Sequence, residues 1–170
     1  MNEIVWPEAY LPGTTDFYVS NETIVSGLNA AQVWPFLVDT AHWSTCCPEL
    51  SDIQFHDNND PGLRLGSRIQ FFFGSSLVQA EIQACVAPTD DEPGRLAWHG
   101  WVERDGQSIL DAHCGWLIED LPHGRVRILW QESLLGSFAR ELARLKPNPV
   151  LSSHQQWVDG IAAAALAVHP

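Results

Sequence analysis

The sequence has little positive charge. Nine Lys and Arg, with Lys146 the single lysine, stand against 21 Asp and Glu, and the formal net charge is −12. Proteins that bind duplex nucleic acid need clustered basic side chains to neutralise phosphates. Anionic membrane surfaces likewise attract basic segments. The charge balance therefore excludes both as partners.

Long apolar runs are missing as well. No segment approaches the roughly 18 residues of a membrane span, so we expect no membrane insertion. Residues 1–8 have neither the basic start nor the apolar stretch of a secretory signal. These two absences predict a cytoplasmic protein.

Cysteines are few, and no Cys-x-x-Cys pair occurs among them: they are Cys46, Cys47, Cys85 and Cys114. Adjacent cysteines rarely form a disulfide with each other because the bond would strain the peptide between them. Reduced thiols fit a cytoplasmic protein. His42 has the spacing to share a helical face with Cys46 and Cys47, but no fourth zinc ligand is evident. Glycine-rich motifs that bind nucleotides and the metal-binding spacing His-x-x-x-His are absent too. We therefore expect no metal and no cofactor.

Tryptophan, in contrast, is abundant, with eight in 170 residues. A hydrophobic content of 45% excludes a disordered acidic chain. By area scaling, a chain of 18.9 kDa buries about 70% of its surface. That supports one core with room for a pocket, and not two ordinary domains. We expect an extended arm over residues 1–16, which contain Pro7, Pro12 and Gly13, and a single domain over 17–170.

Hydrophobic periodicity and turn residues predict the elements of this domain. Asn29 and Gln32 have the spacing of a capping box, which starts a helix at residue 30. Pro35 interrupts that helix, and Ser152 or Ser153 caps the last one. The expected strands are 17–27, 52–56, 68–73, 77–86, 95–103, 110–119 and 125–135, and the expected helices are 30–38, a short one after 40, a stretch over 138–145 and a long C-terminal one.

Alternation in these strands places one face of an antiparallel sheet on a core. In strand 77–86, for example, the even-numbered residues from Val78 to Val86 share the core side. Sequential strands followed by a long helix predict an α+β fold, in which a curved antiparallel sheet of about six to seven strands grips the C-terminal helix. The space between sheet and helix is where a ligand pocket would form.

Five short motifs follow one another along the chain in a characteristic order. They are Val33-Trp34 with Asp39 and Trp43, Leu63-x-x-Gly66-Ser67, Gly94-Arg95-Leu96-Ala97-Trp98-His99-Gly100, Asp111-Ala112-His113 with 117–119, and Gln131-Glu132 with Gly136. Over about residues 17–168, this order resembles the Bet v 1-like/START superfamily with the helix-grip fold, and most closely its SRPBCC polyketide cyclase/dehydrase-like branch. The resemblance implies an internal apolar cavity. Superfamily members include cyclases, lipid carriers, hormone receptors and cochaperones, so it does not imply one chemistry.

The segment 138–150 departs from the family pattern because it adds a helix before the gripping helix. It would act either as a lid or as additional packing. Phe138, Leu142 and Leu145 form an ordinary amphipathic stripe, which favours packing.

The candidate ligand-binding residues are the inward-facing side chains Phe71, Phe73, Ile82, Trp98, Trp116, Ile118, Trp130, Glu132 and Trp157. Four tryptophans of this set, at positions 98, 116, 130 and 157, are expected to line one pocket. Glu132 shares its parity with Trp130, so its carboxylate points inward. There it would pair, bind a polar group of the ligand, act as an acid or base, or reach water at the strand end.

His99 and His113 fall on the outward parity, and a register slip of one residue would move them inside. An inward His113 would join Glu132 as a catalytic acid–base candidate for an aldol-type cyclisation.

Three functions follow from these observations. The first is binding of a small hydrophobic ligand, aromatic or lipid-like, in an internal cavity. The second is a polyketide cyclase/dehydratase-type enzyme, and the third is a cochaperone-like interaction module. Trp101 on the outer sheet face favours the third function, or a homodimer.

Overall fold

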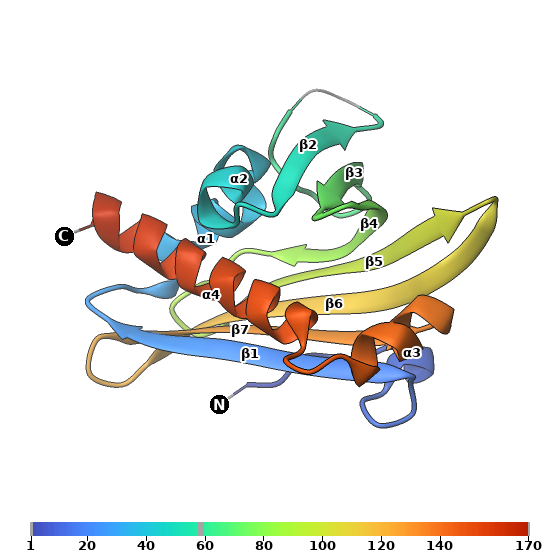
Figure 1. Ribbon diagram of the computed structural model, residues 1–170. Coiled ribbons are helices and arrows are strands. Elements are labelled where there is room, and N and C mark those ends of the chain that lie inside the picture. Colours follow the sequence, from blue (N-terminus) through green and yellow to red (C-terminus); the bar gives the residue numbers. More distant parts are fainter. Residues whose placement is uncertain (1, 58–59, 170) are drawn as a thin grey trace.

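The computed structural model describes residues 2–57 and 60–169, and its main feature is a sheet of seven antiparallel strands that curves around a long helix (Figure 1). The elements in chain order are η1 (Glu8–Tyr10), β1 (Phe17–Ser26), α1 (Ala30–Val38), η2 (Thr40–His42), α2 (Trp43–Cys46), β2 (Leu50–Phe55), β3 (Arg68–Phe73), β4 (Ser76–Val86), β5 (Gly94–Arg104), β6 (Gln107–Leu121), β7 (Arg125–Leu135), α3 (Ser137–Arg144) and α4 (Pro149–Val168). This is the helix-grip α+β fold that the sequence predicts.

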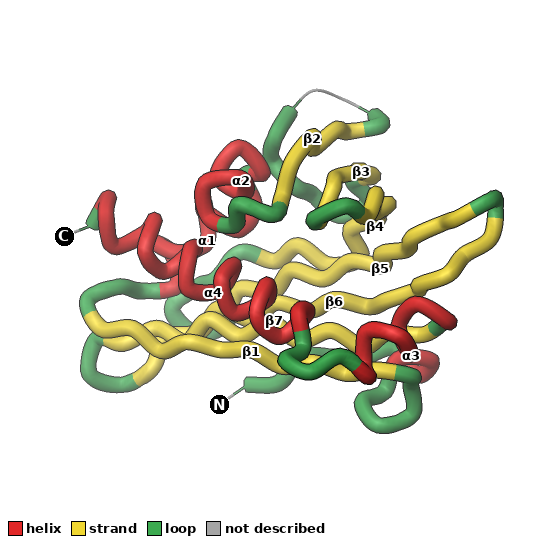
Figure 2. Tube along the Cα trace, in the orientation of Figure 1, coloured by secondary structure: helices red, strands yellow, loops and turns green. Residues whose placement is uncertain are grey.

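The strand order is β1-β7-β6-β5-β4-β3-β2, so β1 and β2 form the two edges of the sheet. Strands β2 to β7 follow one another as hairpins, whereas β1 pairs with the last strand, with Phe17 opposite Leu134. Helices α1 and α2 connect the two edges, and both contact α4 where it crosses the concave face (Figure 2). Within the two described segments, no helix combines the length and hydrophobicity needed to cross a bilayer.

A tight turn and a register shift together set the strand pairing of the central hairpin. Asp105 and Gly106 connect β5 to β6 with φ values of 53° and 74°, the left-handed geometry of a type I′ turn that matches the strand twist. A register shift between Val102 and Glu103 then moves the pairing by one residue, so that Trp98 lies opposite Cys114 and Gly100 opposite Ala112. The inward parity predicted for β5 and β6 is therefore correct.

Strand β4 departs from the predicted alternation. Its register with β5 shifts between Ile82 and Ala84, and beyond this bulge Cys85, not Ala84, packs against the core. Val86 is 53% exposed. The prediction that Ala84 and Val86 share the core side is wrong because one extra residue in the strand reverses the alternation.

Two helix predictions also need correction. Helix α1 begins at the predicted capping box of Asn29 and Gln32 but continues through Pro35 to Val38 without interruption. Helix α4 is capped by Asn148, whose side chain accepts hydrogen bonds from the backbone amides of residues 150 and 151. Pro149 occupies the first helical position, where the missing amide costs nothing. Ser152 and Ser153 therefore lie inside the helix and do not cap it.

The N-terminal arm, residues 2–16, lies along the outer, convex face of the sheet and includes the short helix η1. Ile4 is buried against Leu117 and Leu129. It lies directly over Gly115, where a Cβ atom would approach Ile4 Cγ2 to 2.5 Å. Glycine at 115 therefore makes room for the arm.

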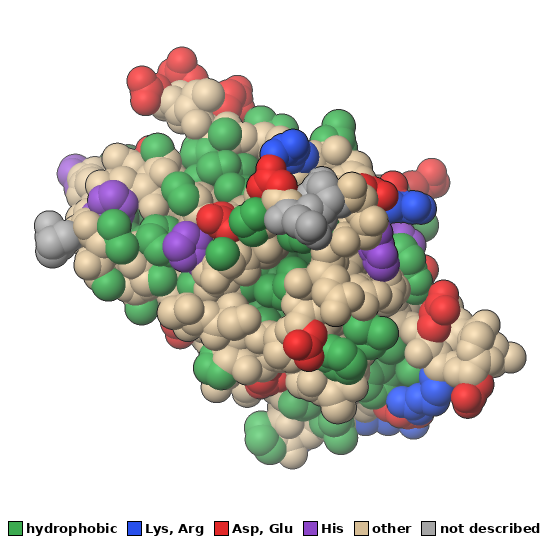
Figure 3. Space-filling model, turned by 90° about the horizontal axis from the view of Figure 1, so that it is seen from above, with side chains coloured by type: hydrophobic (Ala, Val, Ile, Leu, Met, Phe, Trp, Pro, Cys, Tyr) green, Lys and Arg blue, Asp and Glu red, His purple; other side chains and the backbone are tan. Residues whose placement is uncertain are grey.

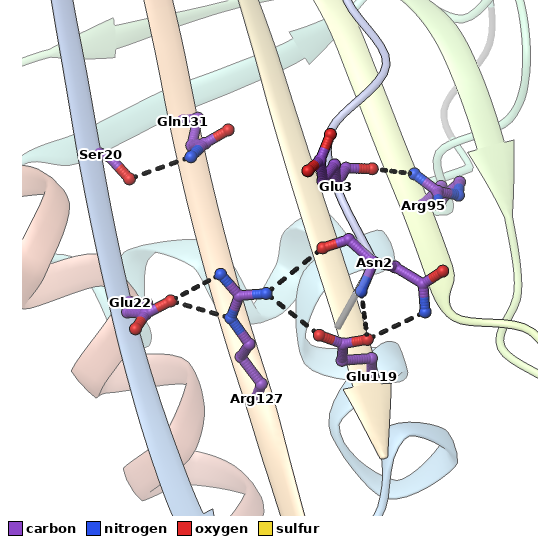
Figure 4. A network of polar contacts seen from close by, with 8 residues as sticks. All are labelled: Asn2, Glu3, Ser20, Glu22, Arg95, Glu119, Arg127 and Gln131. Carbon is purple, nitrogen blue, oxygen red and sulfur yellow. Dashed lines mark hydrogen bonds and ion pairs between the residues drawn. The ribbon is translucent and has the colours of Figure 1, made fainter. Parts of the chain in front are cut away.

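A polar network holds the start of the arm in place (Figure 4). Arg127 donates hydrogen bonds to Glu22 of β1, to Glu119 of β6 and to the carbonyl of Asn2. Asn2 in turn donates to Glu119 from both its backbone and its side chain. Burial alone would raise the pKa of Glu119, but hydrogen bonds from Asn2 and Arg127 outweigh it and hold this pKa below its usual value. Arg95 adds a hydrogen bond to the carbonyl of Glu3.

Candidate ligand-binding cavity

A cavity of about 310 Å³ lies between the concave face of the sheet, α3 and the N-terminal half of α4. It is lined by Glu49, Phe71, Phe73, Ser75, Ser76, Val78, Trp98, Gly100, Val102, Leu110, Ala112, Cys114, Trp130, Glu132, Leu134, Phe138, Leu142, Pro149, Val150, Ser153, His154 and Trp157. Hydrophobic side chains occupy the middle of the molecular face that is seen from above in Figure 3.

Aromatic rings form the deep wall of this cavity. The centroids of Trp130 and Trp157 lie 4.9 Å apart with an interplanar angle of 79°, and those of Trp98 and Trp157 lie 6.2 Å apart. Trp116 stacks behind Trp130 at 4.6 Å and 9°. Trp43 closes the cluster from α2, with its centroid 5.0 Å from that of Trp157. Because edge-to-face and offset pairs are the favoured ring geometries, these indoles hold one another in fixed orientations.

One polar pair interrupts the apolar lining. Glu132 Oε2 lies 3.1 Å from His154 Nε2, and Cys114 Sγ donates to Glu132 Oε1 at 2.9 Å. The His154 ring stacks on Trp130 with centroids 3.4 Å apart. Burial, followed by the nearby charge of Glu132, raises the pKa of the Cys114 thiol well above its usual value. Cys114 therefore remains a protonated donor to the carboxylate.

A second carboxylate lies where the chain enters β2. Glu49 Oε1 accepts a hydrogen bond of 2.8 Å from Ser153 Oγ. Ser153 precedes His154 on α4, so two neighbouring residues of this helix hold the two acidic side chains of the lining.

Comparison with known proteins identifies the family of this cavity-containing fold. Neither a scan against protein-family models nor a search of curated proteins returned a match. Among solved structures, a hypothetical protein from Helicobacter pylori, jhp0584, is 39% identical, with 97% of both chains covered and a TM-score of 0.90. Norcoclaurine synthase from Thalictrum flavum shares the fold at 11% identity, with 91% of this chain and 96% of that chain covered and a TM-score of 0.64. The di-domain ARO/CYC BexL matches at 10% identity, 91% and 48% coverage and a TM-score of 0.61.

The chain belongs to the same family as the Helicobacter pylori protein jhp0584, and it has the Bet v 1-like helix-grip fold. The resemblance identified from the sequence motifs is therefore confirmed at the level of the fold, including the likeness in fold to the di-domain ARO/CYC BexL.

The cavity of this Bet v 1-like protein contains part of the set of residues selected from the sequence. Those that line it are Phe71, Phe73, Trp98, Trp130, Glu132 and Trp157. Ile82, Trp116 and Ile118 are buried in the core and do not line it. Three of the four expected tryptophans thus reach the cavity, while Trp116 lies behind Trp130.

Five polar residues of the lining were not selected from the sequence: Glu49, Ser75, Ser76, Ser153 and His154. The available signal was helical spacing, because His154 precedes Trp157 by three residues and so lies on the same face of α4. Glu49 had no such signal, since it belongs to the connection between α2 and β2.

The structure places His113 outside the cavity. Its ring is buried on the outer face between Trp6 and Tyr10, with centroids 5.6 Å and 5.8 Å away. His99 lies on the same face and stacks on Trp101 at 5.1 Å. The outward parity is correct and no register slip occurs, so His113 cannot contact a ligand in the cavity as the proposed acid or base.

The additional helix α3 closes one end of the cavity. Phe138 and Leu142 are lining residues and Ala139 is fully buried, whereas Leu145 is 48% exposed. Of the predicted apolar stripe, Phe138 and Leu142 therefore pack inward as expected, and Leu145 does not.

Proposed function

We propose that this protein binds a small, largely apolar ligand with a planar aromatic part. The observation that carries the proposal is the cavity of about 310 Å³ whose wall includes Trp98, Trp130 and Trp157. Ligand pockets commonly measure about 300–1,000 Å³ and combine apolar walls with a few polar groups. This cavity lies at the lower end of that range, which favours a ligand of one or two fused rings.

The polar pair of Glu132 and His154 determines the orientation of such a ligand in the cavity. Aromatic walls favour a flat ring between them, and Glu132 with His154 offers hydrogen-bonding groups on one side. A ligand with its ring against Trp157 and a polar substituent toward Glu132 satisfies both parts of the lining.

Filling the cavity should abolish binding. A Cβ atom at Gly100 would meet only ordinary contacts, the nearest being Trp98 Cδ1 at 3.4 Å, and strands accept β-branched residues. Gly100→Val should therefore fold and weaken the binding of 2-naphthol at least about tenfold, since lost apolar contacts of this size are worth about 1–3 kcal/mol. Quenching of tryptophan fluorescence during titration measures the affinity.

Glu103→Val serves as the matched control, because it places the same side chain on an exposed position of the same strand. It should bind 2-naphthol as the wild type does. Equal affinity in the wild type and Gly100→Val would overturn the proposal.

Acid–base catalysis of the cyclase or dehydratase type is the second candidate function. The 3.1 Å contact between Glu132 and His154 favours it, since a carboxylate that orients an imidazole is a recurrent acid–base arrangement. An aldol-type cyclisation begins with removal of a proton α to a carbonyl, and deuterium exchange of 2-tetralone in D₂O measures that step directly.

The wild type should accelerate this exchange, and His154→Phe should lose it by about 10²-fold or more. Phenylalanine keeps the stacking on Trp130, so the fold should persist. His123→Asn, in an exposed turn, is the control and should exchange at the wild-type rate. Unchanged exchange in His154→Phe would rule out this candidate.

A further inference from the structure

The polar side chains around the cavity include two carboxylates, those of Glu49 and Glu132. Within residues 2–57 and 60–169, no lysine or arginine contributes to the lining. The polar lining residues are Glu49, Ser75, Ser76, Glu132, Ser153 and His154. Even with His154 protonated, the two carboxylates leave the lining with a net negative charge.

Glu132 is the deeper carboxylate and has acceptor capacity left over. Its side chain is 13% exposed. Its contacts within the described part of the chain are Cys114 on one oxygen and His154 on the other. An ionised carboxylate offers about four lone-pair positions, so further donors can approach it from the cavity.

Glu49 is the second carboxylate and is half-buried. One of its oxygens accepts from Ser153 Oγ, and in the described residues it forms no ion pair with a basic side chain. Neither acid is therefore paired with a lysine or arginine of the described residues; Glu132 contacts His154, and Glu49 contacts Ser153.

The apolar walls also suit a cation. Ring faces of tryptophan and phenylalanine attract positive charge through their quadrupoles. Phe73 and Trp98 border Trp157 in the lining, with ring centroids 6.3 Å and 6.2 Å from it. The net charge of −12 further favours the approach of cations over anions.

We propose that the ligand of this cavity is a protonated aromatic amine. This inference rests on the proposed binding function and adds the charge of the ligand to it. The ammonium group donates a hydrogen bond to Glu132 and is attracted by the negative charge of Glu49. The aromatic ring of the ligand packs against the indole rings. A carboxylate or phosphate ligand would instead face two like charges, so the same groups select against anions.

A matched series of ligands tests this inference without any mutation. The series consists of 2-(2-naphthyl)ethylamine, 2-(2-naphthyl)ethanol and 3-(2-naphthyl)propanoate, which share one ring system and differ in charge. At pH 7 the amine should bind at least about tenfold more tightly than the alcohol, and the propanoate at least about tenfold more weakly, because one close charge contact is worth about 1–3 kcal/mol. Calorimetric titration measures all three affinities.

The outcomes separate the two proposals. Equal binding of amine and alcohol would overturn the charge inference and leave the binding function standing. Failure of all three to bind would overturn both. Tighter binding of the propanoate would also refute the inference.

Glu132→Gln locates the charge recognition. It should reduce the preference for amine over alcohol to less than about threefold. Glu49→Gln, at the less buried carboxylate, supplies a second variant if Glu132→Gln fails to fold, and it should reduce the same preference. Glu103→Gln makes the same chemical change on the exposed face of β5 and should leave the preference unchanged. If Glu132→Gln and Glu49→Gln both kept the wild-type preference for amine over alcohol, these carboxylates would not be the groups that recognise the ligand's charge.

Discussion

Replacing Gly160 with alanine should destabilise the protein by about 3 kcal/mol, although alanine normally favours a helix over glycine by about 1 kcal/mol. Gly160 lies in α4 where this helix meets α2. A Cβ atom there would lie 1.8 Å from the carbonyl oxygen of Cys46 and 2.7 Å from its carbonyl carbon. These are backbone atoms and cannot rotate away, so the two helices would have to separate.

Separation of the helices would disturb the tryptophan cluster. Trp43 of α2 is fully buried, and its ring meets Trp157 of α4 edge to face at 5.0 Å. Displacing one against the other opens voids in a close-packed core, and such voids cost stability in proportion to their volume. Because Trp157 also lines the cavity, Gly160→Ala should weaken ligand binding as well.

Urea unfolding followed by circular dichroism measures the predicted loss. Ala163 is exposed on the same helix, and Ala163→Gly is the matched control in the reverse direction. It should cost only the intrinsic propensity difference of about 1 kcal/mol. A Gly160→Ala variant as stable as the wild type would show that α2 and α4 are not in this close contact.

Side-chain parity in the long strands could be predicted from the sequence because it depends on local alternation. Trp98, Trp130 and Glu132 point inward as expected, although the register of β5 and β6 shifts between Val102 and Glu103. The bulge after Ile82 could not be predicted in this way. Nothing in the residues 82–86 distinguishes a bulged strand from a regular one.

Which inward residues reach the cavity depends on how the helices cover the sheet. Ile118 pairs with Gly94 and Ile128, at the end of the sheet where Trp34 of α1 packs close to Gly94. The helices fill that end, so Ile118 is core. Parity alone assigns Ile118 and Trp130 to the same face and cannot separate them.

The position of His154 depended on where α4 begins. A helix capped by Ser152 or Ser153 would place His154 in its first turn, whereas the cap at Asn148 places it well inside the helix. There it faces Glu132 across the cavity wall. Reading Asn148-Pro149 as a cap followed by a proline at the first helical position would have placed His154 inside the helix.

The buried histidine of the outer face should make stability fall as the pH is lowered. Burial, helped by the neighbouring charge of His99, lowers the pKa of His113 from 6.5 to about 4. Its ring lies between Trp6 and Tyr10, and neither ring nitrogen has a hydrogen-bond partner in the described residues. Three titratable groups near this ring contact one another, since Asp111 lies 3.1 Å from His99 and accepts a hydrogen bond from the Tyr10 hydroxyl. Protonated His113 would thus bring a charge under the apolar part of the arm.

The sign of the effect follows from the direction of the pKa shift. Between pH 6.5 and about pH 4, the unfolded chain binds a proton at residue 113 and the folded chain does not, so acid favours unfolding in this window. Above pH 6.5 the histidine is neutral in both states, and below about pH 4 it is protonated in both. The shift corresponds to a loss on the order of 3 kcal/mol across the window.

Comparing variants isolates this contribution from that of other groups. The free energy of unfolding of His113→Phe minus that of the wild type should rise by about 3 kcal/mol as the pH falls from 7.5 to 4. His123→Asn, in a turn whose φ of 69° asparagine tolerates, is the matched control at an exposed histidine. A pH-independent difference for His113→Phe would contradict the prediction. Because the sheet separates residue 113 from the cavity, His113→Phe should bind 2-naphthol as the wild type does at pH 7.5, whereas a direct role of His113 in the ligand site would abolish that binding.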